Sequence, residues 1–301
     1  MTNSISPILP IDLSDGLFLS PKIAREIGES FSADYCFSEP YPHIIFDNFL
    51  PQPLIDEILK NFPNENSSAN DVVFKSGYGG HNKRQIHPIS CSARVRMFFD
   101  FFNSPPFLQF LEGLTTIPAI IPDPYFSGGG FHEISEGGKL GIHADFRINE
   151  QLNLNRRLNV LIYLNPNWNI EYGGNLEIWD SGMSNMVKSI APILNRCVIF
   201  STDEKSFHGH PDPLTTTDGI TRKSLALYYY TASTKIYEEL PLHSTMYKAR
   251  PTDPSSITAE AKKLNLHNYK RDWLPPAVLN PRLLLPPTIF RALKKILKLV
   301  K

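Results

Sequence analysis

The sequence contains little cysteine and no excess of either charge. Its three cysteines, Cys36, Cys91 and Cys197, are odd in number and form no Cys-x-x-Cys pair. This pattern indicates neither a disulfide framework nor a zinc knuckle, and it favours a reducing compartment. Lys plus Arg and Asp plus Glu both number 30, so the net charge gives no reason to expect a nucleic-acid partner.

Long apolar runs are also missing. No run is long enough to span a bilayer, and the first residues have neither the basic nor the apolar region of a secretory leader. We therefore expect a soluble, cytoplasmic protein without integral membrane association. A chain of 301 residues suits one domain with helical additions or two smaller domains, and we favour one domain over 1–301.

The N-terminal part, residues 1–117, is expected to supply a strand and supporting helices. Proline-led stretches predict helices that begin near residues 21, 53 and 105, apolar residues between Val95 and Phe102 predict a helix that ends near Asn103, and His43–Phe46 is a strand candidate. Between them, residues 63–90 are polar and rich in Gly, Asn and Ser. We interpret this stretch as a long loop that is a candidate lid, with simple disorder as the alternative.

The pattern changes over residues 118–235. Short runs of β-branched and aromatic residues alternate with Gly, Asn, Pro and Asp turns, and the strand-length runs are 158–164, 176–179, 197–201 and 224–231. This spacing predicts an α+β, mainly β fold with a sandwich or jelly-roll core. Residues 236–301 form a proline-punctuated tail that ends in a basic amphipathic helix over 288–298, for which docking on the protein is favoured over a membrane or partner.

The glycine-rich stretch 128–145 ends in His143-Ala144-Asp145 after a hairpin-like lead-in. In a strand, this spacing places the imidazole and the carboxylate on one face. They make two thirds of the facial triad that holds non-haem Fe(II) with open coordination positions. Taken alone, the pair is more typical of a surface imidazole beside a carboxylate, and the residues that follow reverse this interpretation.

A third ligand is available after the buried run 197–201. His208 is the natural candidate, because a glycine follows it and a strand precedes it. A second His-x-Asp motif, His210-Pro211-Asp212, contains a proline that suits a turn beyond the strand end. His210 is therefore kept as the reserve ligand.

An anion-binding pair follows in the last predicted strand. Arg222 and Ser224 share one face of this strand, and a guanidinium with a hydroxyl two residues on can bind a carboxylate. Lys223 points to the opposite face. The nearby tyrosines, Tyr163 and 228–230, are interpreted as barrel packing rather than chemistry.

Together these residues carry a family resemblance. The order His143-x-Asp145, Arg157 to Asn165, Gly173-Gly174-x-Leu176, Phe200, His208 and Arg222-x-Ser224 resembles the Fe(II)/2-oxoglutarate-dependent oxygenases, in their prolyl-4-hydroxylase-like branch. The match covers roughly residues 120–232. The phrase Ile45 to Leu50 is also similar to the strand that precedes the first helix in many such proteins.

The resemblance implies a double-stranded β-helix (jelly roll). It implies iron held by His143, Asp145 and His208, and 2-oxoglutarate that chelates the metal and pairs its distal carboxylate with Arg222. His132 takes the place of a tyrosine that contacts 2-oxoglutarate in relatives. Arg222 follows His208 by 14 positions, which is more than is usual in the family, so the segment from 211 to 219 must loop out.

The implied activity is hydroxylation of a C–H bond with release of succinate and CO2, and the cofactors are Fe(II), 2-oxoglutarate and O2, with ascorbate as a candidate reductant. The substrate is a prolyl residue, another peptide side chain or a small metabolite. The alternative is a jelly-roll or cupin-like binding module that lacks turnover or holds another metal. The sequence does not specify the oligomeric state.

Overall fold

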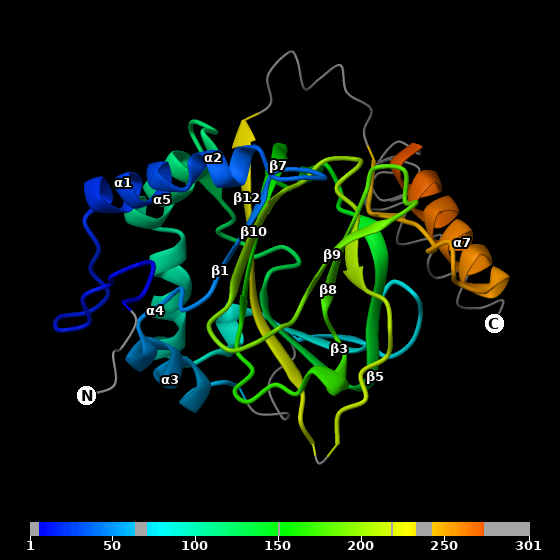
Figure 1. The fold of residues 1–301 in the computed structure, drawn as a ribbon, viewed down its shortest axis with the longest axis horizontal. Coiled ribbons are helices and arrows are strands. Elements are labelled where there is room, and N and C mark those ends of the chain that lie inside the picture. Colours follow the sequence, from blue (N-terminus) through cyan, green and yellow to red (C-terminus); the bar gives the residue numbers. More distant parts are fainter. Residues whose placement is uncertain (1–5, 64–70, 150, 218, 233–242, 274–301) are drawn as a thin grey trace, which may run out of the picture.

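A curled sheet carries the fold, with helices on both sides (Figure 1). We describe a computed structural model, which covers residues 6–63, 71–149, 151–217, 219–232 and 243–273. Its helices are α1 (Pro21–Ser30), α2 (Ser32–Cys36), α3 (Gln52–Lys60), α4 (Ala93–Phe102), α5 (Pro105–Thr115) and α7 (Ser255–Trp273). Its strands are β1 (His43–Phe46), β2 (Val72–Phe74), β3 (His81–Ile86), β4 (Ile121–Pro122), β5 (Gly130–Ala144), β6 (Ile148–Asn149), β7 (Leu154–Tyr163), β8 (Leu176–Trp179), β9 (Met186–Ile190), β10 (Cys197–Ser201), β11 (His208–His210), β12 (Arg222–Ala232) and β13 (Met246–Tyr247).

The strands follow the order β1-β10-β7-β12-β5-β11-β8-β9. The first half of β5 pairs with β12, and its second half pairs with β11, so this one strand belongs to both halves of the sheet. Strands far apart in the sequence are thereby joined into the jelly roll expected from the sequence. The glycine-rich stretch is a single bent strand and not a hairpin, because Gly137, at φ +71, lets the chain change direction within β5.

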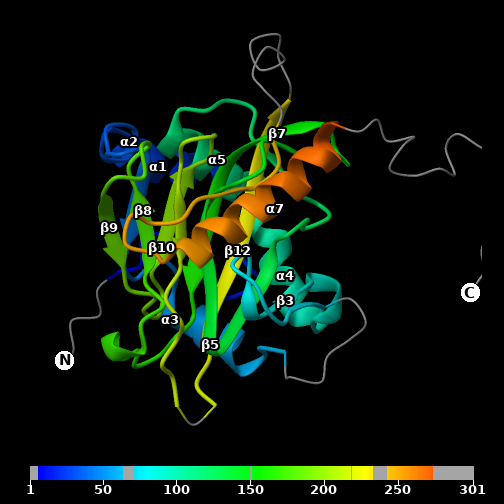
Figure 2. The ribbon, with the colours of Figure 1, turned by 90° about the vertical axis from the view of Figure 1, so that its right-hand side faces the viewer.

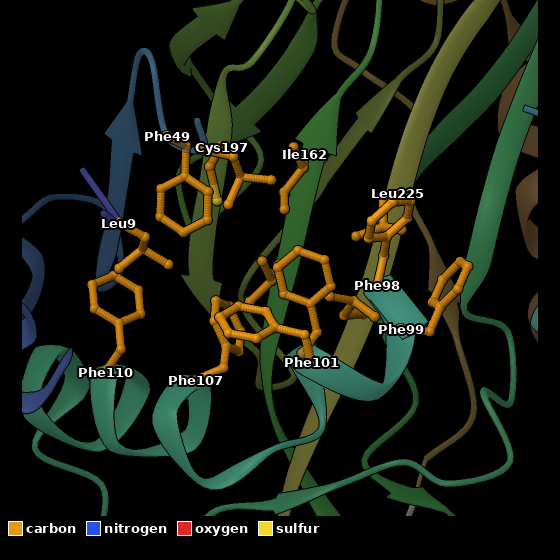
Figure 3. Close-up of a cluster of buried hydrophobic side chains, with 14 of the residues drawn as sticks. Leu9, Phe49, Phe98, Phe99, Phe101, Phe107, Phe110, Ile162, Cys197 and Leu225 are labelled. Atoms are coloured by element: carbon orange, nitrogen blue, oxygen red, sulfur yellow. The ribbon is translucent and has the colours of Figure 1, made fainter. Parts of the chain in front are cut away.

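An aromatic core lies between the larger half of the sheet and the N-terminal helices. Figure 3 shows Phe98 of α4 and Phe107 of α5 on the side of Ile162 of β7 and Leu225 of β12, while Phe110 of α5 lies beside Leu9. Each of these side chains is almost fully buried. Burial of such a side chain contributes about 1.5–3 kcal/mol, so this layer is a large source of stability for the sheet.

The helices predicted near residues 21, 53 and 105 and the helix predicted to end near Asn103 are confirmed. Proline occupies the first turn of α1, α3 and α5, where its missing N–H costs no helical hydrogen bond. Ser92 caps α4 by accepting a hydrogen bond from the Val95 N–H. The strand candidates at 43–46, 176–179 and 197–201 agree with β1, β8 and β10.

Two expectations were wrong. The stretch 63–90 is not a plain loop, because β2 and β3 form a hairpin and β3 pairs along β5. Residues 255–273, for which no helix was predicted within the proline-punctuated tail, form the long helix α7. The basic helix expected at 288–298 lies outside the described residues. No helix among the described residues is long and apolar enough to cross a membrane.

Helix α7 packs beside the strand β13, on the side of the sheet away from the N-terminal helices (Figures 1 and 2). Asn265 of α7 accepts a hydrogen bond from the Tyr247 N–H and donates one to the Tyr247 carbonyl, both at 2.8 Å. Because β13 pairs with the end of β5, α7 holds this C-terminal segment against the strand that carries His143.

Candidate metal centre and its cavity

Three predicted ligands converge at the junction of β5 and β11. His143 lies near the end of β5, Asp145 directly follows that strand, and His208 begins β11. The strand pairing places His208 opposite His143. Residues separated by 65 positions in the sequence are thus brought together by the ladder between two antiparallel strands.

The donor atoms of these three side chains lie close enough to share an ion. The Asp145 carboxylate has Oδ1 at 3.7 Å from His143 Nε2 and Oδ2 at 3.5 Å from His208 Nε2. One ligand atom from each residue lies within 4.8 Å of the others. Donors at such separations can be bridged by a metal that bonds each of them at about 2 Å.

Backbone carbonyls orient both imidazoles. His143 Nδ1 lies 2.9 Å from the Gly141 carbonyl, and His208 Nδ1 lies 2.9 Å from the Ser206 carbonyl. A carbonyl can only accept, so each Nδ1 carries the proton and each Nε2 presents its lone pair to the cluster. Burial lowers the pKa of His143 to about 4 and also lowers the pKa of His208, which keeps both rings in the neutral form that binds metals.

The Asp145 carboxylate is held by two donors. Asn159 Nδ2 donates to Oδ2 at 2.7 Å, and Arg156 Nη2 lies 3.1 Å from the same oxygen. Burial alone raises the pKa of Asp145, but Arg156 and the two histidines outweigh it and leave the pKa below its usual value. The carboxylate is therefore ionised, and Oδ1 is the oxygen left for an ion.

The predictions from sequence did not include Arg156 and Asn159. The ladder between β7 and β12 shifts register between Tyr229 and Tyr230, and this irregularity lets Arg156 and Asn159, three residues apart, both line the cavity. The guanidinium donates two hydrogen bonds to Asn159 Oδ1 and lies 3.7 Å above the Tyr228 ring. Strict strand alternation cannot reveal such a pair, because a bulge breaks the period of two.

A cavity of about 210 Å³ opens beside the three ligands. Arg222 lines it and is buried, as strand alternation predicted, whereas the Lys223 ammonium lies 3.5 Å from Glu133 outside the cavity lining. Arg222 donates from Nε to the Gly174 carbonyl at 2.7 Å and from Nη2 to the Tyr163 hydroxyl at 3.3 Å. These contacts orient the guanidinium and leave Nη1 without a partner among the described residues.

Gly174 explains the glycine pair of the sequence. Its φ is +69, and a Cβ there would meet the Arg222 Cδ at 2.9 Å and a Leu214 methyl at 2.5 Å. Only glycine lets the backbone approach the arginine this closely. Within the segment 211–219, which was expected to loop out, residues 211–217 belong to no strand, and the Leu214 N–H donates to the Gly138 carbonyl.

Ser224 and His132 face each other across the ladder between β12 and β5, and both line the cavity. His132 Nε2 lies 2.9 Å from the Gly128 carbonyl, and burial holds the pKa of His132 well below its usual value. The ring is neutral and lies in the cavity wall. Gln85 of β3 is the register partner of His132 on the other side of β5, so Ser224, His132 and Gln85 lie side by side across three strands.

The reserve ligand His210 is the last residue of β11 and does not lie in a turn beyond the strand. It lines the cavity, but it does not belong to the cluster of close donor atoms. Its Nδ1 is buried without a hydrogen-bond partner among the described residues. Asp212, its motif companion, is mostly exposed and pairs with Arg250 at 2.7 Å.

The interpretation of the tyrosines as packing was incomplete. Tyr229 and Tyr230 are buried away from the cavity, but Tyr163 contacts Arg222 and the Tyr228 ring lies on Arg156. Tyr247 of β13, which the sequence analysis did not single out, lies 5.7 Å from the His143 ring and closes another side of the cavity.

The hairpin β2–β3 contributes Phe74, Lys83 and Gln85 to the cavity wall. Lys83 was missed, because its stretch was interpreted as a loop. Burial lowers the pKa of Lys83 to about 8, and Arg222 and Arg156 add to this effect while Asp145 opposes it. The pKa of Lys83 therefore depends on the charges of Asp145, Arg222 and Arg156 in the same site.

Comparison with known proteins agrees with this constellation. Residues 129–230, about a third of the chain, match the sequence profile of the 2OG-Fe(II) oxygenase superfamily. No curated protein shows significant similarity to the sequence.

Solved structures with a similar fold include prolyl hydroxylases. The enzyme from Trichoplax adhaerens, in complex with a hypoxia inducible factor peptide fragment, has 18% identity and a TM-score of 0.49, and the match covers 69% of this chain and 91% of that chain. A prolyl-4-hydroxylase from Pseudomonas putida has 17% identity and a TM-score of 0.46, with 67% and 98% covered.

Proposed function

We propose that this protein is a 2-oxoglutarate-dependent hydroxylase whose iron ligands are His143, Asp145 and His208, a proposal supported by the match of residues 129–230 to the 2OG-Fe(II) oxygenase superfamily. The observation that carries the assignment is the close approach of two neutral imidazole nitrogens and one carboxylate oxygen in a buried site. This donor set is the facial triad of non-haem iron oxygenases.

Iron and 2-oxoglutarate, when bound, would supply the oxidation with O2 as the oxidant: one oxygen atom of O2 would enter the succinate formed with CO2 from 2-oxoglutarate, and the other would hydroxylate a C–H bond of the substrate. The protein's own residues provide geometry. His143 and His208 are held in the tautomer that presents Nε2, and Asn159 and Arg156 occupy one Asp145 oxygen so that the other faces the ion. This arrangement fixes the ligands before the metal arrives.

Arg222 is proposed to bind the distal carboxylate of 2-oxoglutarate. Its Nε and Nη2 are already fixed by Gly174 and Tyr163, so the free Nη1 is presented in one orientation. Ser224 and His132, on neighbouring strands beside Arg222, are proposed as further contacts to the co-substrate. Fixing these donors beforehand reduces the entropy that binding would otherwise cost.

The hairpin β2–β3 supports a lid role for part of the stretch 63–90. Phe74 and Gln85 line the cavity, and Tyr247 Oη donates to the Gly79 carbonyl at 3.4 Å, so the hairpin meets the C-terminal segment over the site. A cover of this kind excludes water from the reaction. A cytoplasmic location is part of the proposal, supported by the three cysteines, which are all free.

The direct test is succinate formation from 2-oxoglutarate by the purified protein, measured by mass spectrometry with Fe(II), with ascorbate as reductant, and with iron omitted. We expect slow succinate release that requires both iron and 2-oxoglutarate. Metal binding without any succinate would contradict the proposal and favour a cupin-like module that holds another metal.

The choice of ligand has its own test. His208→Ala should abolish Fe(II) binding measured by calorimetry, because it removes one of three donors, whereas His210→Ala should retain it. The reverse result would show that His210 is the ligand.

A further inference from the structure

Cations outnumber anions around the cavity. Lys83, Arg156 and Arg222 line it, and Asp145 is the one carboxylate among its lining residues. The four lining histidines have lowered pKa values and add no charge. The two charges of Fe(II) would be balanced by the two carboxylates of 2-oxoglutarate, so an excess of positive charge persists in the loaded site.

Two of the three cations already have a role. Arg156 is bound to Asp145 and Asn159, and the rings of Phe146 and Tyr228 lie against its guanidinium at 4.7 and 3.7 Å. Arg222 is the proposed partner of the distal carboxylate of 2-oxoglutarate. Lys83 is the cation that neither the fold nor the co-substrate accounts for.

The strand ladder fixes where Lys83 lies. Ile134 of β5 is the register partner of Lys83 on β3 and of Arg222 on β12, so the two cations flank one apolar residue. Neighbouring strands lie about 4.8 Å apart, which puts the two backbones about 10 Å apart. Lys83 and Arg222 therefore enter the cavity from strands on opposite sides of β5.

The Lys83 ammonium has no carboxylate partner within the described part of the chain. Its one contact with a specific group there is the Phe74 ring, 5.4 Å away. Lys83 is half-buried, and even partial burial of a cation without a counter-charge is unfavourable, in agreement with the lowered pKa of its ammonium. A ligand that brings a negative charge to this point would remove the penalty.

We propose that Lys83 binds a carboxylate of the substrate, so that the enzyme hydroxylates a small carboxylic acid and not an internal prolyl residue of a peptide. The inference rests on the proposed function. A prolyl residue within a chain has no charge to offer, and its binding would bury Lys83 unpaired. A cavity of about 210 Å³, which must also hold 2-oxoglutarate, suits a small substrate.

The co-substrate itself does not explain Lys83. 2-Oxoglutarate has two carboxylates, of which one chelates the metal with the adjacent keto group and the other is assigned to Arg222. No third anionic group is left for a lysine on the far side of Ile134. The anion at Lys83 must come from a different molecule.

The first arm of the test measures 2-oxoglutarate affinity by anaerobic titration of the Fe(II) enzyme, followed through its visible absorption. Lys83→Met should change the dissociation constant by less than about threefold, whereas Arg222→Met should raise it at least about tenfold. If Lys83→Met weakens 2-oxoglutarate as much as Arg222→Met does, Lys83 serves the co-substrate and the inference is overturned. If wild type binds no 2-oxoglutarate at all, the proposed function itself has failed.

The second arm compares small carboxylic acids with their primary amides, and with peptides that contain an internal proline. Each compound is added to the Mn(II) and 2-oxoglutarate complex for thermal shift and to the Fe(II) enzyme for succinate release. Acids should stabilise and stimulate the protein more than their amides, and Lys83→Met should weaken this effect at least about tenfold.

Two controls separate charge from structure. Lys83→Arg keeps a cation at the same point and should restore most of the preference for acids. Lys75→Met removes an exposed lysine of the same hairpin and should behave as wild type. A panel in which no acid exceeds its amide, or in which internal-proline peptides act best, overturns the inference.

Discussion

The two faces of β12 differ in what determines their residues. Leu225, Leu227 and Tyr229 point to the helix-backed core, while Arg222 and Ser224 point into the cavity. All five are buried. On the core face, apolar packing against α4 and α5 accounts for each residue. On the cavity face, the burial of polar groups raises the free energy of the folded protein, and apolar packing does not offset this increase.

This difference separates stability from function. The core face should tolerate only residues of similar volume, and its changes should lower the free energy of unfolding. The cavity face should tolerate changes structurally, and they should alter binding and turnover. Each of the following predictions tests one face or the contrast between the two.

The largest expected effect is on the metal site. Asp145→Ala removes the one carboxylate ligand, and we expect turnover to fall at least about a thousand-fold with loss of Fe(II) binding. Succinate release and calorimetry measure the two effects. Asp212→Ala, in the other His-x-Asp motif, is the matched control and should keep both. Iron-dependent turnover in Asp145→Ala would contradict the ligand assignment.

A change in the layer that packs on the core face of β12 should instead lower the stability of the protein. Phe107 of α5 belongs to this layer and contacts the ring of Tyr229. Phe107→Ala removes a fully buried ring that lies between Phe102 and Phe110, and we expect it to lower the free energy of unfolding by about 3–5 kcal/mol. Urea denaturation measures this change. Phe37→Ala, at a side chain that is 84% exposed, should stay within about 0.5 kcal/mol of wild type. Equal losses in the two variants would show that the helix-backed layer is not the main core.

A change at Arg222, on the cavity face, should weaken ligand binding and leave the fold intact. Removal of a charged hydrogen-bond partner costs about 1.5–3 kcal/mol, so Arg222→Met should weaken 2-oxoglutarate about 10- to 100-fold. The Fe(II) affinity should stay near that of wild type, since Arg222 does not belong to the donor cluster. Loss of both affinities together would indicate a collapsed cavity, and a folded-state check by circular dichroism would reveal it.

The smallest effect is a pH dependence that distinguishes two cations on the same wall. The Lys83 ammonium, with a pKa of about 8, is mostly charged at neutral pH, and its charge is lost as the pH rises through that value. Acid binding should therefore weaken above about pH 8, while 2-oxoglutarate binding through the arginine should persist, because a guanidinium stays protonated. The groups around Lys83 are Asp145, Arg222, Arg156, His132, His143 and His210.

Affinity titrations at pH 7 and 9 measure this contrast. Lys83→Arg should lose the pH dependence of acid binding. If acids and 2-oxoglutarate weaken in parallel, the two cations do not act on different molecules.

Local sequence patterns predicted much of the fold. Proline-led helices and strands such as Cys197–Ser201 were found because their signals are local. The hairpin β2–β3 was missed, because its Gly- and Asn-rich stretch becomes a strand only through pairing with β5. Helix α7 was missed too, because the prolines on either side of it indicate a linker and an irregular tail.

The candidate site shows the same limit. His143, Asp145, His208 and Arg222 could be named from their order and strand alternation. Arg156 depends on an irregular ladder, and Lys83 depends on an unexpected strand. Both are consequences of tertiary pairing, which one sequence without a structure does not specify.

The most direct measurement of the central claim is the visible spectrum of the anaerobic Fe(II) protein titrated with 2-oxoglutarate. The account predicts a charge-transfer band that saturates with one iron and one 2-oxoglutarate per chain and that is absent in Asp145→Ala. A wild-type protein that gives no band, or an Asp145→Ala variant that keeps it, would contradict the assignment of this cavity as an iron and 2-oxoglutarate site.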